Sequence, residues 1–517
     1  MIGKFSGLLA SVSAMAFANA AWANVEISNR ATVNLDCQVG TCTATAKKAV
    51  LNVGDLQAML AGGDVAVKTG TLAKDIDIDQ PLTWSSTSRL TLDAQRCITA
   101  KKPVSVTGTG ALTIIYNDGA SDGDLLFVDK GSVTFWDANS NLVINGQSYT
   151  LVKGIATLAA DIAANPSGFY ALANSYDAKH DRFDNVPIPT KFSGTLEGLG
   201  HSIAHLKIKK SILIKIGASR FHVEGLFGYV TSGVIRDLVL AKASVSAKRT
   251  TYVGTLAGRN SGAIMHVASD GSVTAENGQI GGLVGTNDGT IVNASADVTV
   301  VATGSANAGG LAGDSVSGSI FRSHATGSVS GHSAGGLAGI ATNVIQSYAT
   351  GPVAGVYEAG GLIGAGSEID QSYATGAVTA GDKATAGGLI GVGRDIGNCY
   401  AMGSVSAQRK SLAGGFAGRG YQISASYSIG SLSAGEESFA GGFVGKNDLH
   451  NSLTDVYWDT ETAEVGVGCG KGDCTGVTGL TTQELQSGLP SGFDPKLWGQ
   501  QPDINGGFPY LLGLPPN

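Results

Sequence analysis

A glycine-rich motif recurs nine times in the second half of the chain and constrains the fold more than any other feature. Its fullest form is Gly-Gly-Leu-x-Gly, and successive closing glycines are 30, 27, 28, 26, 25, 27, 27 and 27 residues apart. Self-similarity at a fixed period of this length is typical of solenoids, in which each unit stacks on the next. The closing glycines are Gly228, Gly258, Gly285, Gly313, Gly339, Gly364, Gly391, Gly418 and Gly445.

A second motif repeats in phase with the first, so each repeat offers three short β-prone segments separated by glycine-rich corners. No repeat has the helical pattern of about 10 to 15 residues that a βαβ unit requires. We therefore expect an all-β, right-handed parallel β-helix with about three strands per rung, about fifteen rungs between residues 50 and 455, and one rod on the order of 70 Å long. The second motif begins at Ser323, Ser347, Ser372, Cys399 and Ser426.

The composition fits a folded solenoid rather than a flexible linker. Glycine accounts for 76 of the 517 residues and charged residues for 15%, while 43% are hydrophobic and regularly spaced, which excludes a disordered glycine-rich chain. We expect glycine at the corners because corners need a positive φ and because stacked corners leave no room for a Cβ. The Leu or Phe after the glycine pair is expected to point inward and to stack on its equivalent one rung away.

The N-terminus has the pattern of a secretory signal peptide, which we place at residues 1–23. Lys4 precedes an apolar run from Phe5 to Phe17, and two small-x-small cleavage patterns follow at 18–20 and 21–23. No later stretch reaches the roughly 18 apolar residues of a transmembrane helix, so no transmembrane anchor is expected. The net charge of −7 gives no reason to bind nucleic acid. The most basic stretch, 207–215, alternates Lys with Ile or Leu, which favours a solvated strand face over a binding patch.

Two cysteine pairs lie near the ends of the mature chain: Cys37 with Cys42, and Cys469 with Cys474. We expect two local disulfides that limit fraying of the terminal rungs. A zinc site is the alternative, but it needs four ligands in one place and no second pair is near either of these. Cys97 is expected to face a strand interior as a small hydrophobic residue.

Cys399 occupies the position that serine holds in four other repeats, so it is expected to be a small stacking residue rather than a reactive thiol. Ser333 lies in GHSAG, which matches the nucleophile elbow of α/β-hydrolases. In the repeat alignment, however, it holds the variable position of Asn307 and Glu358, and no helix is expected after it. A hydrolase nucleophile is therefore not expected.

His201 and His205 have the i, i+4 spacing of helical metal ligands, but their neighbours alternate like a strand and the zincin glutamate is missing. Asp75, Asp77 and Asp79 alternate with isoleucine, which places three carboxylates on one outward strand face. We interpret them as a solvated face that discourages edge pairing. A calcium site is the alternative, but it would need converging loops. No cofactor and no metal are expected.

The pattern GGLxG…I-x-x-S-x-A-x-G-x-V resembles the GLUG repeat of bacterial surface proteins, and Asn260, Asn287 and Asn447 match the Asn that often follows its last glycine. Segments upstream resemble those that precede GLUG repeats in filamentous-haemagglutinin-like adhesins, among them LTLDAQRCITAKKPVSVTGTGALTIIYNDG and FSGTLEGLGHSIAHLKI. The resemblance implies a β-helical adhesin that a Gram-negative bacterium exports with the help of an outer-membrane secretion partner. GLUG repeats also accompany some secreted metallopeptidases, but the chain has no H-E-x-x-H.

These observations divide the chain into five parts. After the signal peptide we expect an N-terminal cap at 24–48, haemagglutinin-like rungs at 49–222, nine GLUG-type repeats at 223–448 and a C-terminal capping region at 449–517, with a capping box at Thr481 and Glu484. We expect a secreted or surface-exposed, non-enzymatic adhesin that binds glycans or proteins of host or neighbouring cells. One alternative is a polysaccharide-degrading enzyme, which would need clustered Asp with Lys or Arg on one face over successive rungs, whereas the repeat region shows mostly Ser, Thr and Ala outward. The other alternative is a scaffold of a surface or biofilm assembly.

Overall fold

The computed structural model describes residues 23–516 except 120–121, 184, 249–251 and 451, so the expected signal peptide lies almost entirely outside the described residues. The protein is 53% strand and 6% helix and forms a β-solenoid of about 16 turns with parallel strands. The predicted all-β parallel solenoid is therefore confirmed.

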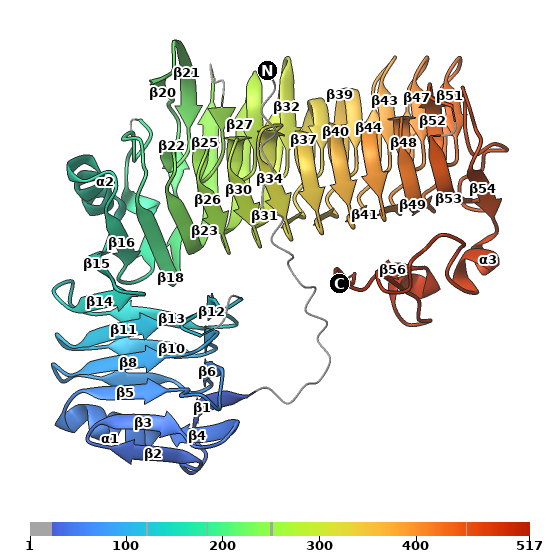
Figure 1. Ribbon diagram of the computed structural model, residues 1–517. Helices are drawn as coiled ribbons and strands as arrows, with labels where there is room; N and C mark the ends of the chain where they lie inside the picture. The colour runs from blue at the N-terminus through green and yellow to red at the C-terminus, as the bar shows by residue number, and fades with distance from the viewer. Residues whose placement is uncertain (1–22, 120–121, 184, 249–251, 451, 517) are drawn as a thin grey trace, which may run out of the picture.

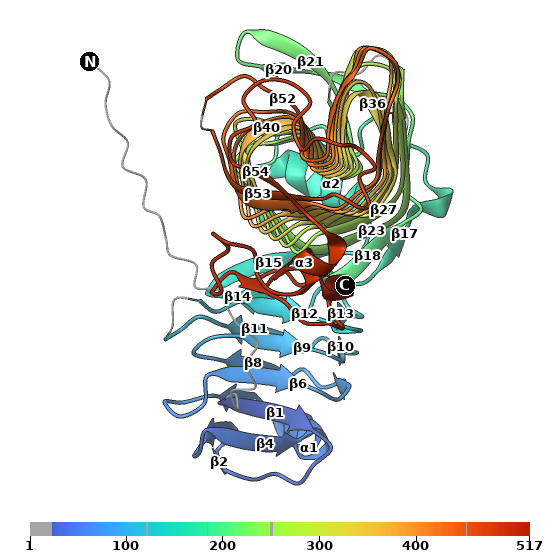
Figure 2. The same ribbon diagram turned by 90° about the vertical axis from the view of Figure 1, so that its right-hand side faces the viewer.

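The solenoid has two arms rather than the single straight rod that we expected (Figure 1). The first arm runs from β1 (Asn24–Ser28) to β14 (Asn141–Ile144), and the second from β15 (Gln147–Val152) to β54 (Val477–Leu480). Figure 2 looks along the second arm, whose rungs superimpose, while the first arm stands below it. The molecule is therefore L-shaped, and two separate hydrophobic cores follow the two arms.

The corner forms because the chain reverses direction at Asn145 and Gly146. β14 pairs antiparallel with β15, and Ile144 lies opposite Gln147. The two loop residues have φ of +47° and +79°, as the tight turns of two-residue hairpins require. Helix α2 (Ile155–Ala164) then packs its buried face into the core of the second arm, so a new stack begins in a different direction.

In the second arm a rung consists of three strands, as predicted. One rung has β36 (Val329–Gly335), β37 (Ala338–Ile345) and β38 (Tyr348–Ala349). Each pairs in parallel with its equivalent in the next rung, namely β39 (Val353–Gly360), β40 (Ile363–Asp370) and β41 (Tyr373–Ala374). In the following rung the first strand is divided into β42 (Val378–Ala380) and β43 (Thr385–Gly387).

The apolar column after the glycine pair is confirmed, because its side chains are fully buried. The rings of Phe416 and Phe443 stack with centroids 4.6 Å apart. The column consists of Leu283, Leu311, Leu337, Leu362, Leu389, Phe416 and Phe443.

The repeat glycines serve close packing, and the expectation of a positive φ at them is wrong. None of the nine closing glycines is among the described residues with positive φ. Instead, a Cβ on Gly310 would lie 2.2 Å from the carbonyl oxygen of Gly336, and one on Gly336 would lie 2.1 Å from that of Gly361. Left-handed bends fall on other residues instead. One recurs directly before the same position of eight rungs, which is Ser or Cys in five of them: His266, Asn293, Arg322, Gln346, Gln371, Asn398, Ala425 and Asp455.

The C-terminal segment covers a side of the second arm rather than only its last coil. It includes α3 (Thr482–Gln486), which begins at the predicted capping box of Thr481 and Glu484, and β56 (Tyr510–Leu511). Trp498 packs against Tyr400 and Tyr427, one rung apart. Five tyrosines of successive rungs form the covered ladder: Tyr348, Tyr373, Tyr400, Tyr427 and Tyr457.

Candidate binding groove on the second arm

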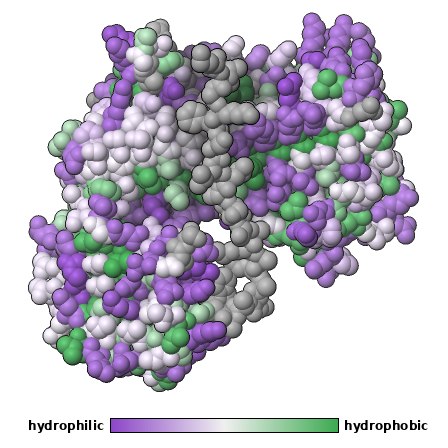
Figure 3. Space-filling view, in the orientation of Figure 1, coloured by the Kyte–Doolittle hydropathy of each residue, from purple (hydrophilic) through white to green (hydrophobic). Residues whose placement is uncertain are grey.

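A groove of about 550 Å³ follows the second arm across successive rungs. Strands β37, β40, β44 (Ile390–Gly397), β49 (Ile423–Ser428) and β53 (Leu453–Asp459) supply most of its lining. Most of the face shown in Figure 3 is hydrophilic or neutral, and hydrophobic residues form a row along the second arm. The groove is lined by Asn343, Ile345, Glu368, Ile369, Asp370, Asp395, Ile396, Gly397, Gln422, Ile423, Ser424, Ser452 and Thr454.

Three exposed polar side chains repeat along this groove because the same bend occurs in three successive rungs. Asn343, Glu368 and Asp395 have φ of +58°, +54° and +53°, and each precedes a buried aliphatic residue of its strand. Parallel pairing of β37, β40 and β44 keeps the three rungs in register. These polar groups therefore repeat at about the 4.8 Å spacing of neighbouring strands.

A hydrogen-bonded network holds the side of the groove in place. Gln346 accepts from Arg322 Nε at 2.9 Å and donates to Gln371 at 3.1 Å. The two carboxylate oxygens of Asp370 accept from Gln371 and Asn398, each at 2.9 Å. Asp370 is thus fixed by amides of its own rung and the next one, and the groove is organised before any ligand binds.

The carboxylates of Glu368, Asp370 and Asp395 were not recognised from the sequence, which we interpreted as mostly Ser, Thr and Ala on the outer surface. A signal was present, because each residue flanks the isoleucine that recurs in its own repeat, in Glu-Ile-Asp at 368–370 and Asp-Ile-Gly at 395–397. Carboxylates and amides on one face can accept hydrogen bonds from several hydroxyl groups of a ligand. No cluster of three or more metal-ligating side chains is found among the described residues.

Ser333 lies in β36 and has no features of a nucleophile elbow. It pairs with Asn307 in one rung and Glu358 in the next, as the repeat alignment predicts. Its hydroxyl donates to Glu358 Oε2 at 2.9 Å, and the next element is strand β37 rather than a helix.

His201 and His205 have separate partners. His201 is buried in β18 (Thr195–Ala204), and its Nε2 lies 2.8 Å from the carbonyl oxygen of Val133. Burial lowers the pKa of His201. His205 follows the strand, and its Nδ1 lies 2.8 Å from Asp177 Oδ1.

The expectation of a solvated carboxylate face at Asp75, Asp77 and Asp79 is wrong. Asp75 is buried and accepts two hydrogen bonds from Arg96, at 2.9 and 2.6 Å. Asp79 lies 2.9 Å from Lys101 Nζ. Their strand, β6 (Asp75–Ile78), is paired on both sides and is not an edge, because rungs stack above and below it.

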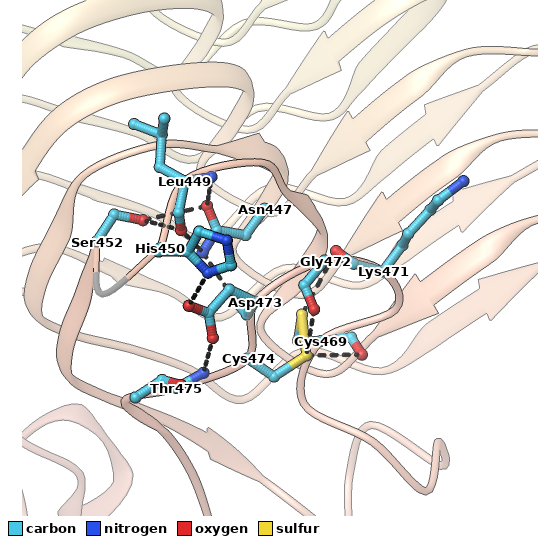
Figure 4. Close-up of a disulfide and its surroundings, with 10 residues drawn as sticks. All are labelled: Asn447, Leu449, His450, Ser452, Cys469, Lys471, Gly472, Asp473, Cys474 and Thr475. Atoms are coloured by element: carbon cyan, nitrogen blue, oxygen red, sulfur yellow. Dashed lines mark hydrogen bonds and ion pairs between the residues drawn. A yellow bond between two sulfur atoms is a disulfide. The ribbon is translucent and has the colours of Figure 1, made fainter.

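The structure joins Cys37 to Cys42 and Cys469 to Cys474. The second disulfide closes a loop in which Asp473 accepts from the Thr475 N–H at 2.9 Å and lies 3.0 Å from His450 (Figure 4).

Cys399 is fully buried among the stacked serines, and burial raises its pKa well above the ordinary value. Its N–H donates to Ser426 Oγ at 3.1 Å, as expected of a stacking residue. Cys97 does not face the strand interior as we expected, because it precedes β9 (Ile98–Ala100) and is partly exposed.

The basic stretch at 207–215 is not one continuous strand. β19 (Lys207–Ile208) pairs with β23 (Val234–Ala247), whereas β20 (Ile212–Ile216) forms a hairpin with β21 (Ser219–Glu224). Lysines of this stretch help to line a pocket of about 520 Å³, whose lining is Lys179, His180, Asp181, Arg182, Phe183, Lys207, Lys209 and Lys210.

A buried charge cluster joins the two arms. Arg236 of β23 lies 2.5 Å from Asp237 Oδ2 and 3.3 Å from Glu197 Oε2. Burial alone would lower the pKa of Arg236, but Asp237, Glu197 and Asp124 raise it above the ordinary value. Burial and the adjacent Asp237 raise the pKa of Glu197. The cluster is a structural element of the corner.

No helix within the described part of the chain is long and apolar enough to cross a membrane. Two solved structures are similar at a low level. A Bacteroides ovatus protein provisionally named an immunoglobulin A1 protease is 14% identical, with a TM-score of 0.29 over 71% of this chain and 93% of that one. An IgA1 protease is 18% identical, with a TM-score of 0.31 over 56% of this chain and 23% of that one. Similarity at this level carries no inference about activity.

Sequence comparison gives a more specific result. Halomucin of Haloquadratum walsbyi is 30% identical over 141 residues, which are 27% of this chain but only 1% of that protein. The GLUG motif matches residues 276–301, which reach from just before β28 (Gly278–Gly281) into β31 (Ser295–Ala302). The same strand pattern recurs in register in the rungs that follow. The chain thus contains a GLUG motif at 276–301, within a stack of rungs that repeat its strand pattern.

Proposed function

We propose that the protein is a secreted or surface-exposed adhesin that binds glycans through the groove on the second arm. The observation that carries this proposal is the repetition of Asn343, Glu368 and Asp395 at rung spacing along a preorganised groove. A polysaccharide also repeats along its length, so several of its hydroxyl groups can meet equivalent acceptors in successive rungs. Two local disulfides support a place outside the cytoplasm, because disulfides persist in oxidising compartments.

A glycan-cleaving enzyme is the second candidate, and the carboxylates of the groove favour it. Glycoside hydrolysis commonly uses a pair of carboxyl groups that flank the scissile bond, and Glu368, Asp370 and Asp395 line one groove. We favour binding without turnover because Asp370 already accepts hydrogen bonds from two amides, which suits a fixed acceptor better than a group that must exchange protons.

The test is a glycan and matrix-protein binding screen with residues 24–517, accompanied by an assay for released sugar. The double variant Glu368→Gln/Asp395→Asn should weaken glycan binding by about ten-fold or more, as expected for central contacts. The control Glu436→Gln/Glu437→Gln removes the same charge from another exposed corner and should bind like the unmodified protein. Sugar release abolished by the groove variant would establish the enzyme instead. Binding to no glycan would refute the proposal.

A further inference from the structure

A second, smaller pocket lies at the corner, where strands of both arms end side by side. Its volume is about 300 Å³, and it is lined by Thr134, Phe135, Trp136, Lys153 and Asn174. The pocket is formed by the ends of strands that are hydrogen-bonded to one another. The N–H of Phe135, at the end of β13 (Ser132–Phe135), donates to the Ala173 carbonyl at 2.8 Å, and the Ala173 N–H donates to Val152 at 2.8 Å.

Trp136 exposes 66% of its surface in this pocket, whereas Trp84, Trp458 and Trp498 are at most 5% exposed. Single exposed apolar side chains are common on protein surfaces, but an exposed indole beside a pocket offers a ligand a large flat face. The backbone of Trp136 is well anchored. Its backbone N–H donates to the Val106 carbonyl at 2.9 Å, and its carbonyl accepts from Lys153 Nζ at 2.6 Å. Trp136 therefore presents the flat apolar face of its indole to solvent from a fixed point of the backbone.

Asn174 supplies the polar counterpart. Its side-chain oxygen is buried and has no hydrogen-bond partner among the described residues. A buried acceptor without a donor is unfavourable, and nearly all such groups in proteins are satisfied. Lys153 has three donor hydrogens and uses one for the Trp136 carbonyl. The pocket thus offers an aromatic face, one unsatisfied acceptor and spare donors.

We propose that this pocket is a sugar-binding subsite. This inference rests on the proposed function, because it takes the ligand of the protein to be a glycan. The apolar face of a pyranose ring packs on the Trp136 indole, one hydroxyl donates to Asn174 Oδ1, and a second oxygen accepts from Lys153. A pocket of about 300 Å³ accommodates a sugar unit but not a helix or a strand. A purely apolar ligand would leave Asn174 unsatisfied.

The experiment measures binding of residues 24–517 to an oligosaccharide array, followed by fluorescence titration with each oligosaccharide that binds. Trp136→Ala should weaken binding by about ten-fold or more, as for an aromatic anchor, and Asn174→Ala should weaken the same ligands. Trp136→Phe should keep part of the affinity but lose the change in tryptophan emission. Tyr357→Ala is the control, because it removes another aromatic residue that is 52% exposed and should bind normally.

The outcomes separate this inference from the proposed function. If Trp136→Ala and Asn174→Ala bind every oligosaccharide like the unmodified protein, the subsite is refuted while the adhesin proposal stands. If the unmodified protein binds no oligosaccharide, both are refuted. Thermal unfolding of each variant checks that its fold is retained; Trp136→Ala should cost little stability, because the Trp136 side chain is mostly exposed.

Discussion

The guanidinium of Arg236, in the second arm, donates to Asp124 Oδ1 of the first arm at 2.8 Å. The same nitrogen donates to the Leu125 carbonyl at 2.8 Å, and Nη1 lies 3.2 Å from the Tyr116 hydroxyl. The side chain of Arg236 is only 9% exposed, so solvent screens these bonds weakly. One arginine therefore links the two arms at the corner.

Replacing this arginine should destabilise the corner. In Arg236→Met the carboxylates of Glu197, Asp237 and Asp124 lose their shared counter-charge, and leaving buried charges unpaired costs about 3–5 kcal/mol. Urea unfolding measures the change in the free energy of unfolding, and small-angle X-ray scattering detects any opening of the L shape. The control is Arg419→Met, whose ion pair with Asp448 is partly exposed and should contribute less than about 1 kcal/mol. Equal losses in the two variants would contradict the role assigned to Arg236.

Glu224 makes stability depend on pH. It is fully buried, and neither carboxylate oxygen has a hydrogen-bond partner in the described part of the protein. Burial raises its pKa from 4.5 to about 8. Between these values the folded state keeps a proton that the unfolded state has lost, so the free energy of unfolding falls by about 1.4 kcal/mol per pH unit as the pH rises.

Glu224→Gln should therefore be more stable than the unmodified protein at pH 8 and equally stable at pH 4. The glutamine is neutral at every pH, so the loss between pH 4.5 and 8 disappears. Thermal unfolding at both pH values measures the difference, with the exposed Glu437→Gln as the control that should change neither. A gain of the same size at pH 4 would show that Glu224 acts through packing rather than through its proton.

The repeat spacing was sufficient to predict the second arm at the level of single residues. It placed Asn307, Ser333 and Glu358 in one column, and these residues pair in successive strands. The prediction works because the identity of a glycine or an inward leucine depends mostly on the rungs directly above and below it.

The corner and its sites could not be derived in the same way. An Asn-Gly pair between two β-prone runs is a hairpin signal, and Asn145–Gly146 was overlooked because residues 49–222 were interpreted as a continuation of the rungs. The contact between Arg236 and Asp124 joins residues 112 positions apart, and no periodicity predicts it. The pairing of Asp75 with Arg96 was missed because alternation with isoleucine suggested an outer face, whereas a full countercharge allows a buried carboxylate.

In the column of stacked serines, replacing the cysteine by serine should be tolerated, whereas removing a serine hydroxyl should not. Ser372 Oγ accepts from the buried N–H of Ser347 at 3.1 Å and donates to the Asp370 carbonyl at 2.9 Å. Ser372→Ala leaves that N–H without an acceptor and should cost about 1–3 kcal/mol. Cys399→Ser inserts the residue that this column holds elsewhere and should change the free energy of unfolding by less than about 1 kcal/mol. Urea unfolding compares the two, and a larger loss for Cys399→Ser would refute the equivalence of the positions.

A methyl group on a repeat glycine should be tolerated only where the backbone leaves room for it. In Gly336→Ala the new Cβ would lie 2.1 Å from the Gly361 carbonyl oxygen and 2.8 Å from the Ala349 Cβ, so two rungs must separate, at a cost of at least about 1–3 kcal/mol. Gly62→Ala is the matched control, because it lies in α1 (Val53–Gly62) and its Cβ would meet nothing within 4 Å. Since alanine favours helix by about 0.5–1 kcal/mol over glycine, this control should be slightly more stable than the unmodified protein. Thermal unfolding of both variants tests whether close approach, rather than a positive φ, explains the glycines: a Gly336→Ala protein as stable as Gly62→Ala would contradict it.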